Sequence, residues 1–249
     1  MIQIKAIDKE PWVELPKGST FENWSKDDLI KYNQQNRQAS KYYFFKAAFD
    51  FLYCNEIKGD YYEFGCHTAR TFRMALTEAK RQQMDDIYFY AFDSFEGLPC
   101  CDKEDTNISG WTKGALTTTE DDFIKIIHEH GIYTNRVNTV KGFYNESLNK
   151  DLQNKLLKDG SKASLVCVDC DLYMSAKDVF NFLEPFLQEG TLVYIDDMFA
   201  GHKGSPYKGV YKALVEFEKQ TDFVFEPHMQ VGWHGRSFVT CILTSTLIR

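Results

Sequence analysis

Short apolar segments alternate with amphipathic segments along most of the chain. Five apolar runs have the length of buried strands: Tyr61–Cys66, Ile87–Phe92, Val137–Lys141, Leu165–Val168 and Thr191–Ile195. The segments between them carry apolar residues at three- and four-residue spacing, which predicts helices. Strands that alternate with helices pair in parallel through right-handed crossovers, so the pattern predicts a three-layer α/β sandwich.

Polar residues indicate where three of these helices begin. Thr68 is expected to cap the helix after the first run, and Ser175 the helix after the fourth. Thr119 forms a capping box with Asp122, and Gly131 is expected to end that helix. These signals strengthen the alternating strand–helix assignment.

The two ends of the chain depart from this alternation. The first 25 residues lack periodicity, and a helix is expected from about Lys26 to Ile57, with a break near Ser40 left open. Its apolar residues recur at helical spacing: Tyr43, Phe44, Ala47, Ala48, Phe51 and Leu52. We therefore expect an N-terminal arm and helical lid over residues 1–57 and a catalytic domain over 58–249.

The last two strand-like runs should form a hairpin. Phe223–Val231 and Ser237–Leu243 are joined by only Gly232–Arg236, and a loop that short permits only an antiparallel pair. The sheet should then hold five parallel strands and a hairpin with one reversed strand. Among nucleotide-binding α/β folds, such a hairpin is typical of S-adenosylmethionine (SAM) methyltransferases, with a Rossmann-like class I fold, rather than of dehydrogenases.

Charge and composition exclude several classes. With 29 Lys plus Arg against 36 Asp plus Glu, the formal net charge of −7 disfavours a nucleic-acid binder, which needs a basic face. No apolar run approaches the roughly 18 to 20 residues that span a bilayer, and the start does not resemble a signal peptide. We expect a cytoplasmic protein without a membrane partner, whose seven dispersed cysteines are free thiols.

Candidate ligand-binding residues lie at the ends of the first two runs, since open α/β sheets bind ligands beyond the carboxyl ends of their strands. Gly65 permits a sharp turn before a helix N-terminus, but the glycines of GxGxxG are absent, which disfavours NAD. Asp93 is placed to accept hydrogen bonds from ribose hydroxyls. The alternatives are a purely structural turn at Gly65 and a solvated loop acid at Asp93.

Acidic residues follow the fourth and fifth runs. Asp169 and Asp171 end one, and Asp196 and Asp197 end the other. Adjacent parallel strands would bring these carboxylates together, and they could not all stay ionised without a cation. Carboxylate oxygens suit magnesium better than zinc. The alternative is that each acid caps a helix N-terminus.

The segments YYEFGCHTARTF, FDSFEGLP, VDCDLYMS and GTLVYIDDMF together resemble the macrocin O-methyltransferase family (TylF/MycF type), over about Arg37 to Leu243. This resemblance implies a SAM-dependent enzyme that methylates sugar hydroxyls of natural products with the help of Mg2+. The implied cofactor-binding residues are Glu63, Gly65, Cys66, His67, Thr68, Asp93, Ser94 and Asp169. The implied magnesium ligands are Asp169, Asp196 and Asp197, with Asp171 as an alternative or neighbouring ligand.

The chain departs from the family at the base. A histidine is expected in the loop after the second strand, but Cys100–Leu116 contains none and offers Trp111 and Lys113 instead. We therefore take His202, Asp169 and Lys113 as candidate catalytic residues, with His234 as the second histidine candidate.

The sequence thus predicts a magnesium-assisted SAM-dependent O-methyltransferase acting on a hydroxyl of a sugar-containing or similar small acceptor. Two alternatives stay open: methylation of an amine or carboxylate, and a SAM-binding protein with little catalysis. The expected partner is a small-molecule acceptor, and a homo-oligomer is left open.

Overall fold

The computed structural model describes residues 16–100, 103–105, 108 and 110–243. The chain divides into two compact units, residues 1–39 and 40–249. In the described part of the first lie the short 3-10 helix η1 (Gly18–Phe21) and the beginning of α1 (Lys26–Cys54). Helix α1 continues into the second unit without the break considered near Ser40.

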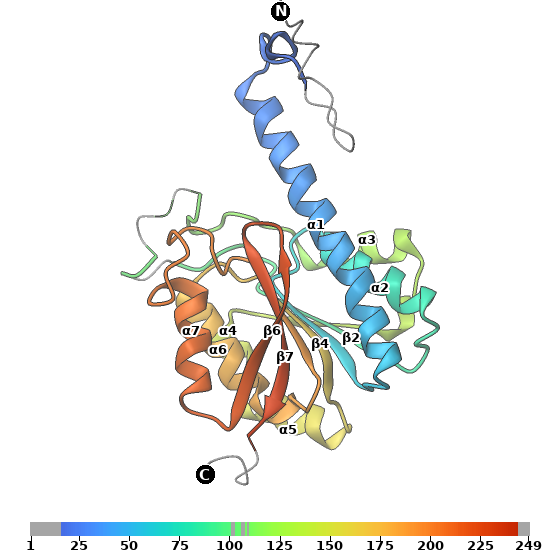
Figure 1. The fold of residues 1–249 in the computed structure, drawn as a ribbon. Helices are drawn as coiled ribbons and strands as arrows, with labels where there is room; N and C mark the ends of the chain where they lie inside the picture. The colour runs from blue at the N-terminus through green and yellow to red at the C-terminus, as the bar shows by residue number, and fades with distance from the viewer. Residues whose placement is uncertain (1–15, 101–102, 106–107, 109, 244–249) are drawn as a thin grey trace, which may run out of the picture. The chain divides into compact units, whose positions relative to one another are not determined.

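A seven-stranded sheet forms the centre of the second unit (Figure 1). Its strands are β1 (Asp60–Phe64), β2 (Phe89–Asp93), β3 (Val137–Lys141), β4 (Ala163–Val168), β5 (Leu192–Ile195), β6 (Phe223–Val231) and β7 (Gly235–Ile242). The order is β3-β2-β1-β4-β5-β7-β6. Strand β7 is antiparallel to both β5 and β6, and the other neighbours are parallel. The expected hairpin with one reversed strand is confirmed.

Helices cover both faces of this sheet (Figure 1). They are α2 (Arg70–Arg81), α3 (Glu120–His130), α4 (Tyr144–Ser147), α5 (Lys150–Lys158), α6 (Tyr173–Leu183) and α7 (Gly209–Glu218), with 3-10 helices η2 (Thr134–Arg136) and η3 (Glu184–Phe186). One hydrophobic core lies between the sheet and α6 and α7, and the other between the sheet and α1, α2 and α3. Cys167 packs in one core and Cys170 in the other, as an offset of three at the end of a strand predicts.

The buried face of α1 differs from the predicted one. Tyr43 is 68% exposed, whereas Phe45 and Phe49 are fully buried. The buried stripe is Lys41, Phe44, Phe45, Ala48, Phe49 and Leu52. This is the helical three- and four-residue spacing with a different starting residue, and it places a lysine on the core-facing side.

Two of the predicted helix caps are wrong, and one is confirmed. Thr119 accepts a hydrogen bond from the Asp122 N–H, as predicted. Thr68 does not cap α2, because Ala69 adopts a left-handed conformation and the helix begins one residue later. Ser175 lies inside α6, whose first N–H, that of Tyr173, donates to Asp105 from a distant loop.

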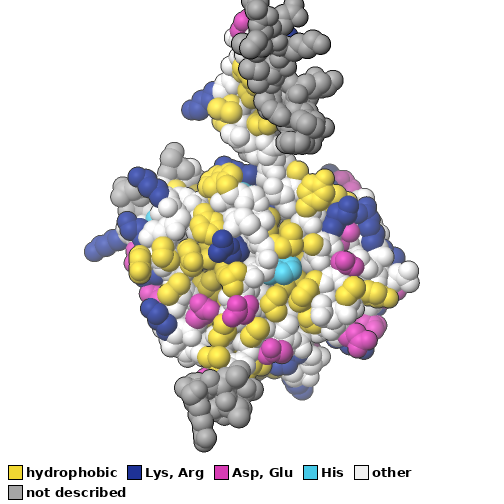
Figure 2. Space-filling model, viewed as in Figure 1, with side chains coloured by type: hydrophobic (Ala, Val, Ile, Leu, Met, Phe, Trp, Pro, Cys, Tyr) yellow, Lys and Arg dark blue, Asp and Glu magenta, His cyan; other side chains and the backbone are white. Residues whose placement is uncertain are grey.

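Charged side chains of both signs are interspersed on the face drawn in Figure 2, and the basic ones form no continuous area on that face. None of the helices in the described part of the chain is long and apolar enough to cross a membrane.

Candidate active site

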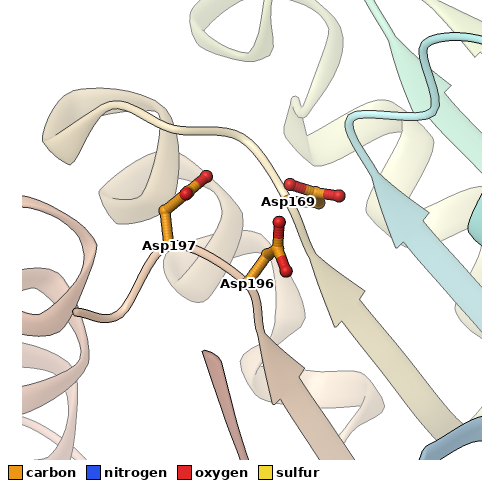
Figure 3. A group of neighbouring side chains, drawn as sticks. All are labelled: Asp169, Asp196 and Asp197. Carbon is orange, nitrogen blue, oxygen red and sulfur yellow. The ribbon is translucent and has the colours of Figure 1, made fainter. Parts of the chain in front are cut away.

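Three carboxyl groups meet at the carboxyl ends of β4 and β5 (Figure 3). The two strands pair in parallel, with Val168 opposite Ile195, so the residues that follow them lie side by side. Asp169, Asp196 and Asp197, here called the acid cluster, each bring one oxygen within 4.8 Å of the others. The juxtaposition expected from the sequence is therefore present.

A lysine side chain enters this cluster from α1. Lys41 Nζ lies 2.7 Å from Asp196 Oδ2 and 3.1 Å from Asp169 Oδ2, and its side chain is only 7% exposed. Burial opposes the charge, but the carboxylates of Asp169 and Asp196 outweigh it and hold the pKa of Lys41 well above its usual value. The chain itself thus supplies a cation to its crowded carboxylates.

Asp196 contacts three polar side chains, those of Lys41, Tyr194 and His234. Its Oδ1 accepts a hydrogen bond from the Tyr194 hydroxyl and lies 3.0 Å from His234 Nδ1. Burial alone would raise the pKa of Asp196, but Lys41 and His234 hold it well below its usual range. Asp196 is therefore a carboxylate whose position is fixed from three sides.

Asp197 and Asp171 lie side by side. Burial and the Asp171 charge raise the pKa of Asp197, and burial together with Asp169 raises the pKa of Asp171 to about 7. The backbone of Asp171 also has a φ of 60°, a conformation that residues other than glycine adopt rarely. This strained residue links the acid cluster to the start of α6 at Tyr173.

The turn after β1 lies against the acid cluster. Gly65 has a φ of 90°, and a Cβ there would lie 1.8 Å from the Asp169 carbonyl oxygen, so only glycine fits. The Asp169 N–H in turn donates to the Phe64 carbonyl, at 2.8 Å. The backbone of the first turn is therefore in direct contact with the backbone of the acid cluster at Asp169.

Asp93 organises this turn from β2. Its Oδ2 accepts hydrogen bonds from the N–H groups of Cys66, at 2.7 Å, and His67, at 3.2 Å, and its Oδ1 accepts from Phe95. Ser94 uses its hydroxyl within its own turn, donating to the Gly97 carbonyl. Asp93 thus ties together the two loops in which the cofactor-binding residues were expected.

Glu63 and Thr68 occupy different environments. Glu63 is fully buried and accepts hydrogen bonds from the hydroxyls of Thr71, at 2.6 Å, and Tyr61. Burial raises the pKa of Glu63 to about 7, against the lowering effect of these hydrogen bonds. Thr68 is half-buried beside the turn and lines an open pocket with Arg70.

The candidate bases from the sequence have different partners and different exposure. His202 Nε2 is paired with Asp105 Oδ1, at 2.8 Å, and the ring lies against Trp111. His234 is buried at Asp196, and Lys113 is exposed in the loop between β2 and α3. The loop that lacks a histidine thus contributes Asp105 to a pair with a histidine from another loop.

Sequence reasoning did not identify Lys41, Tyr194 or Asp105 as site residues. Lys41 is 128 residues from Asp169 in the chain. The sequence offers one indication of its role. Lys41 lies one helical turn before Phe44 and Phe45, on the face of α1 that is buried in the structure. The pairing of Asp105 with His202 depends on two loops meeting, which no local pattern reports.

Known structures share this fold. The O-methyltransferase NovP superposes with a TM-score of 0.64 at 16% identity, covering 80% of this chain and 79% of NovP. CalS11, a calicheamicin methyltransferase, gives 0.62 at 15% identity, with 86% and 80% covered. TomG, an O-methyltransferase from Streptomyces achromogenes involved in tomaymycin synthesis, gives 0.50 at 11% identity, with 80% and 79% covered. No curated protein matches the chain in sequence.

The strand order, the single reversed strand and these neighbours define the class I methyltransferase fold. The family model of macrocin O-methyltransferase (TylF) matches residues 39–238, and the chain belongs to this family.

Proposed function

We propose that the protein is a SAM-dependent O-methyltransferase that uses Mg2+ and methylates a sugar hydroxyl. The main support for this proposal is the position of three carboxylates, Asp169, Asp196 and Asp197. They lie together at the carboxyl edge of the sheet, beside the Gly65 turn that precedes α2. Methyl transfer by direct displacement needs no covalent enzyme intermediate. The protein must mainly hold the acceptor oxygen in line with the methyl group, which is worth up to roughly 7–11 kcal/mol.

The donor set of the acid cluster fits magnesium. Asp169, Asp196 and Asp197 offer hard carboxylate oxygens within 4.8 Å of one another, without a histidine or thiolate among the three. Bound there, the ion would supply a Lewis acid that favours ionisation of the acceptor hydroxyl. Because Asp196 is fixed in position, its carboxylate would be a preorganised ligand of the ion.

The ends of β1 and β2 are the proposed SAM site. Gly65, Cys66, His67 and Thr68 form the turn before α2, and Asp93 with Ser94 follows β2. The three N–H bonds of Asp93 use both lone pairs of Oδ2 and one of Oδ1, so Oδ1 can still accept a hydrogen bond from a ribose hydroxyl. The Glu63 carboxyl group is not exposed. It stabilises the turn through the hydrogen bond that it accepts from the Thr71 hydroxyl.

The proposed base is Asp171. Its carboxyl group is hydrogen-bonded to Asp197, a member of the acid cluster, whereas the His202 ring is engaged by Asp105 and Trp111. His202 is the second candidate, since an aspartate that fixes one ring nitrogen can orient the other as a base. Comparing Asp171→Asn with His202→Gln separates them. Loss of kcat by more than about 100-fold, with SAM binding retained, identifies the base.

Support for the proposed acceptor class is found in one structural relative. CalS11 is described as a TDP-rhamnose 3'-O-methyltransferase. We therefore propose nucleotide-linked and glycosidic deoxysugars as the first acceptors to assay.

Calorimetry with SAM, S-adenosylhomocysteine and NAD, each with and without Mg2+, tests the proposal. SAM and S-adenosylhomocysteine should bind under both conditions, and NAD should not. Binding of NAD in preference to SAM would contradict the methyltransferase assignment. SAM binding combined with no methyl transfer to any hydroxyl acceptor would favour an amine or carboxylate acceptor, or a SAM-binding protein with little catalysis.

A further inference from the structure

Lys41 is a buried cation placed where a metal ion would also be attracted. Its ammonium group bonds the Oδ2 atoms of both Asp169 and Asp196, at 3.1 and 2.7 Å. The side-chain exposures are 7% for Lys41 and 11% for Asp196, so water screens this charge poorly. A lysine is rarely buried to this extent unless its charge is paired.

The lysine and the ion would use the same carboxylates. Asp196 Oδ1 already contacts the Tyr194 hydroxyl and His234 Nδ1, and its Oδ2 accepts a hydrogen bond from Lys41. A metal ion bound to Asp196 must therefore share an oxygen with one of these donors. A carboxylate oxygen can accept a hydrogen bond and bind a metal together, because it has two lone pairs. The two positive charges would then lie a few ångströms apart and repel.

We propose that Lys41 is a built-in counter-ion that keeps the acid cluster assembled without metal and lowers the affinity of the cluster for Mg2+. It is a positioning residue: it bonds the ligands and not the reacting atoms. Without it, Asp169 and Asp196 would repel each other in the metal-free protein. With it, the cluster stays formed, and the ion binds against an opposing charge. This inference rests on the proposed function of the acid cluster as a magnesium site.

The consequence for the enzyme concerns when the ion binds. Because Lys41 reduces the net negative charge of the acid cluster, the free protein binds Mg2+ weakly. Oxygen atoms of the acceptor can then act as further ligands of the ion and strengthen its binding. Lys41 thereby couples retention of the ion to the presence of acceptor. The fold, in contrast, does not depend on the ion.

The test is Mg2+ titration of the metal-free full chain by calorimetry, for wild type, Lys41→Met and Lys41→Gln. Methionine keeps the length of the apolar stem, and glutamine can still donate a hydrogen bond but carries no charge. Both variants should bind Mg2+ about tenfold or more tightly than wild type, because a nearby positive charge has been removed. Lys80→Met is the matched control, since Lys80 pairs with Asp85 at an exposed site and should leave Mg2+ affinity unchanged.

Thermal unfolding of the same proteins provides the second readout. Lys41→Met should melt at a lower temperature than wild type without metal, and saturating Mg2+ should raise its melting temperature more than that of wild type. If Lys41→Met folds only with Mg2+, the same conclusion follows. A lysine with a merely structural role would lower the melting temperature without increasing Mg2+ affinity.

Unchanged or weaker Mg2+ binding by Lys41→Gln would overturn the inference, as would absence of Mg2+ binding by every variant. The first result leaves the proposed function untouched. The second also removes Mg2+ from the proposed function, but it leaves SAM-dependent methyl transfer standing as long as SAM still binds. Failure of SAM binding by wild type contradicts the proposed function separately.

Discussion

At the scale of single residues, the carboxyl groups near the site differ mainly in what surrounds them. Asp196 has a cation and two hydrogen-bonding partners, and its pKa is lowered. Glu63 is fully buried and accepts hydrogen bonds from the hydroxyls of Thr71 and Tyr61, and burial raises its pKa to about 7. The same chemical group is thus stabilised as an anion at one site and as a neutral acid at another.

Glu63 should make stability depend on pH. Its pKa in the folded protein, about 7, lies above the ordinary value of 4.5, so the folded state binds more protons between these pH values. The free energy of unfolding should therefore fall as the pH rises through this window, by up to about 3 kcal/mol. Urea unfolding at pH 5 and pH 8 should show this loss in wild type and a smaller one in Glu63→Gln. Equal losses in both proteins would show that Glu63 is not the cause.

Asp93 should affect both ligand binding and stability. Asp93→Ala removes the proposed ribose acceptor and should weaken SAM binding by more than about tenfold, since hydrogen bonds to a charged group contribute about 1.5–3 kcal/mol. It also leaves the N–H groups of Cys66, His67 and Phe95 without their acceptor, so the melting temperature should fall. Calorimetry and thermal unfolding measure the two effects, with the exposed Asp86→Ala as control. Unchanged SAM affinity would remove Asp93 from the site.

At the scale of elements, loops that are distant in sequence hold the edge of the sheet together. Asp105, from the loop after β2, is 1% exposed. It accepts the Tyr173 N–H at the start of α6, at 2.9 Å, and pairs with His202 from the loop after β5. One carboxylate therefore caps a helix and joins two loops beside the acid cluster.

Replacing Asp105 separates hydrogen bonding from charge. Asp105→Ala leaves the Tyr173 N–H unsatisfied in a buried position and should lower the free energy of unfolding by about 2–3 kcal/mol. Asp105→Asn keeps an oxygen acceptor and should recover most of that loss. Chemical unfolding measures both. If asparagine is as destabilising as alanine, the charge pair with His202 is the main contribution, and the helix cap is secondary.

At the scale of the whole molecule, the alternating pattern predicts the fold well. The β3 and β6 runs match the strands residue for residue, and the short loop at Gly232–Arg236 predicts the reversed strand. These features depend on local sequence. The acid cluster could be predicted because strand ends of a parallel sheet share one edge, a consequence of topology alone.

The features that could not be predicted depend on contacts between distant segments. Ser175 fits a capping pattern, yet α6 begins earlier because Asp105 supplies a non-local acceptor. The crowded carboxylates predict a cation, but only the folded chain shows that Lys41 is one. Local sequence reports periodicity and turns, and it does not report which loop reaches which helix.

The described cysteines are free thiols, and Cys101 lies outside the described residues. Cys66, Cys167 and Cys170 are buried, and burial raises the pKa of each thiol, which keeps them protonated and unreactive. The melting temperature should therefore be the same with and without reducing agent. A melting temperature several degrees lower in reducing agent would reveal a stabilising disulfide.

The central claim is that the acid cluster holds the ion needed for methyl transfer, while the ends of β1 and β2 hold SAM. The most direct measurement follows transfer of a labelled methyl group from SAM to a sugar acceptor, with chelator and after Mg2+ is restored, while SAM binding is measured on the same samples. Chelator should abolish transfer reversibly and leave SAM binding nearly unchanged, and Asp196→Asn should behave like the chelated wild type. Full transfer in excess chelator would contradict the account.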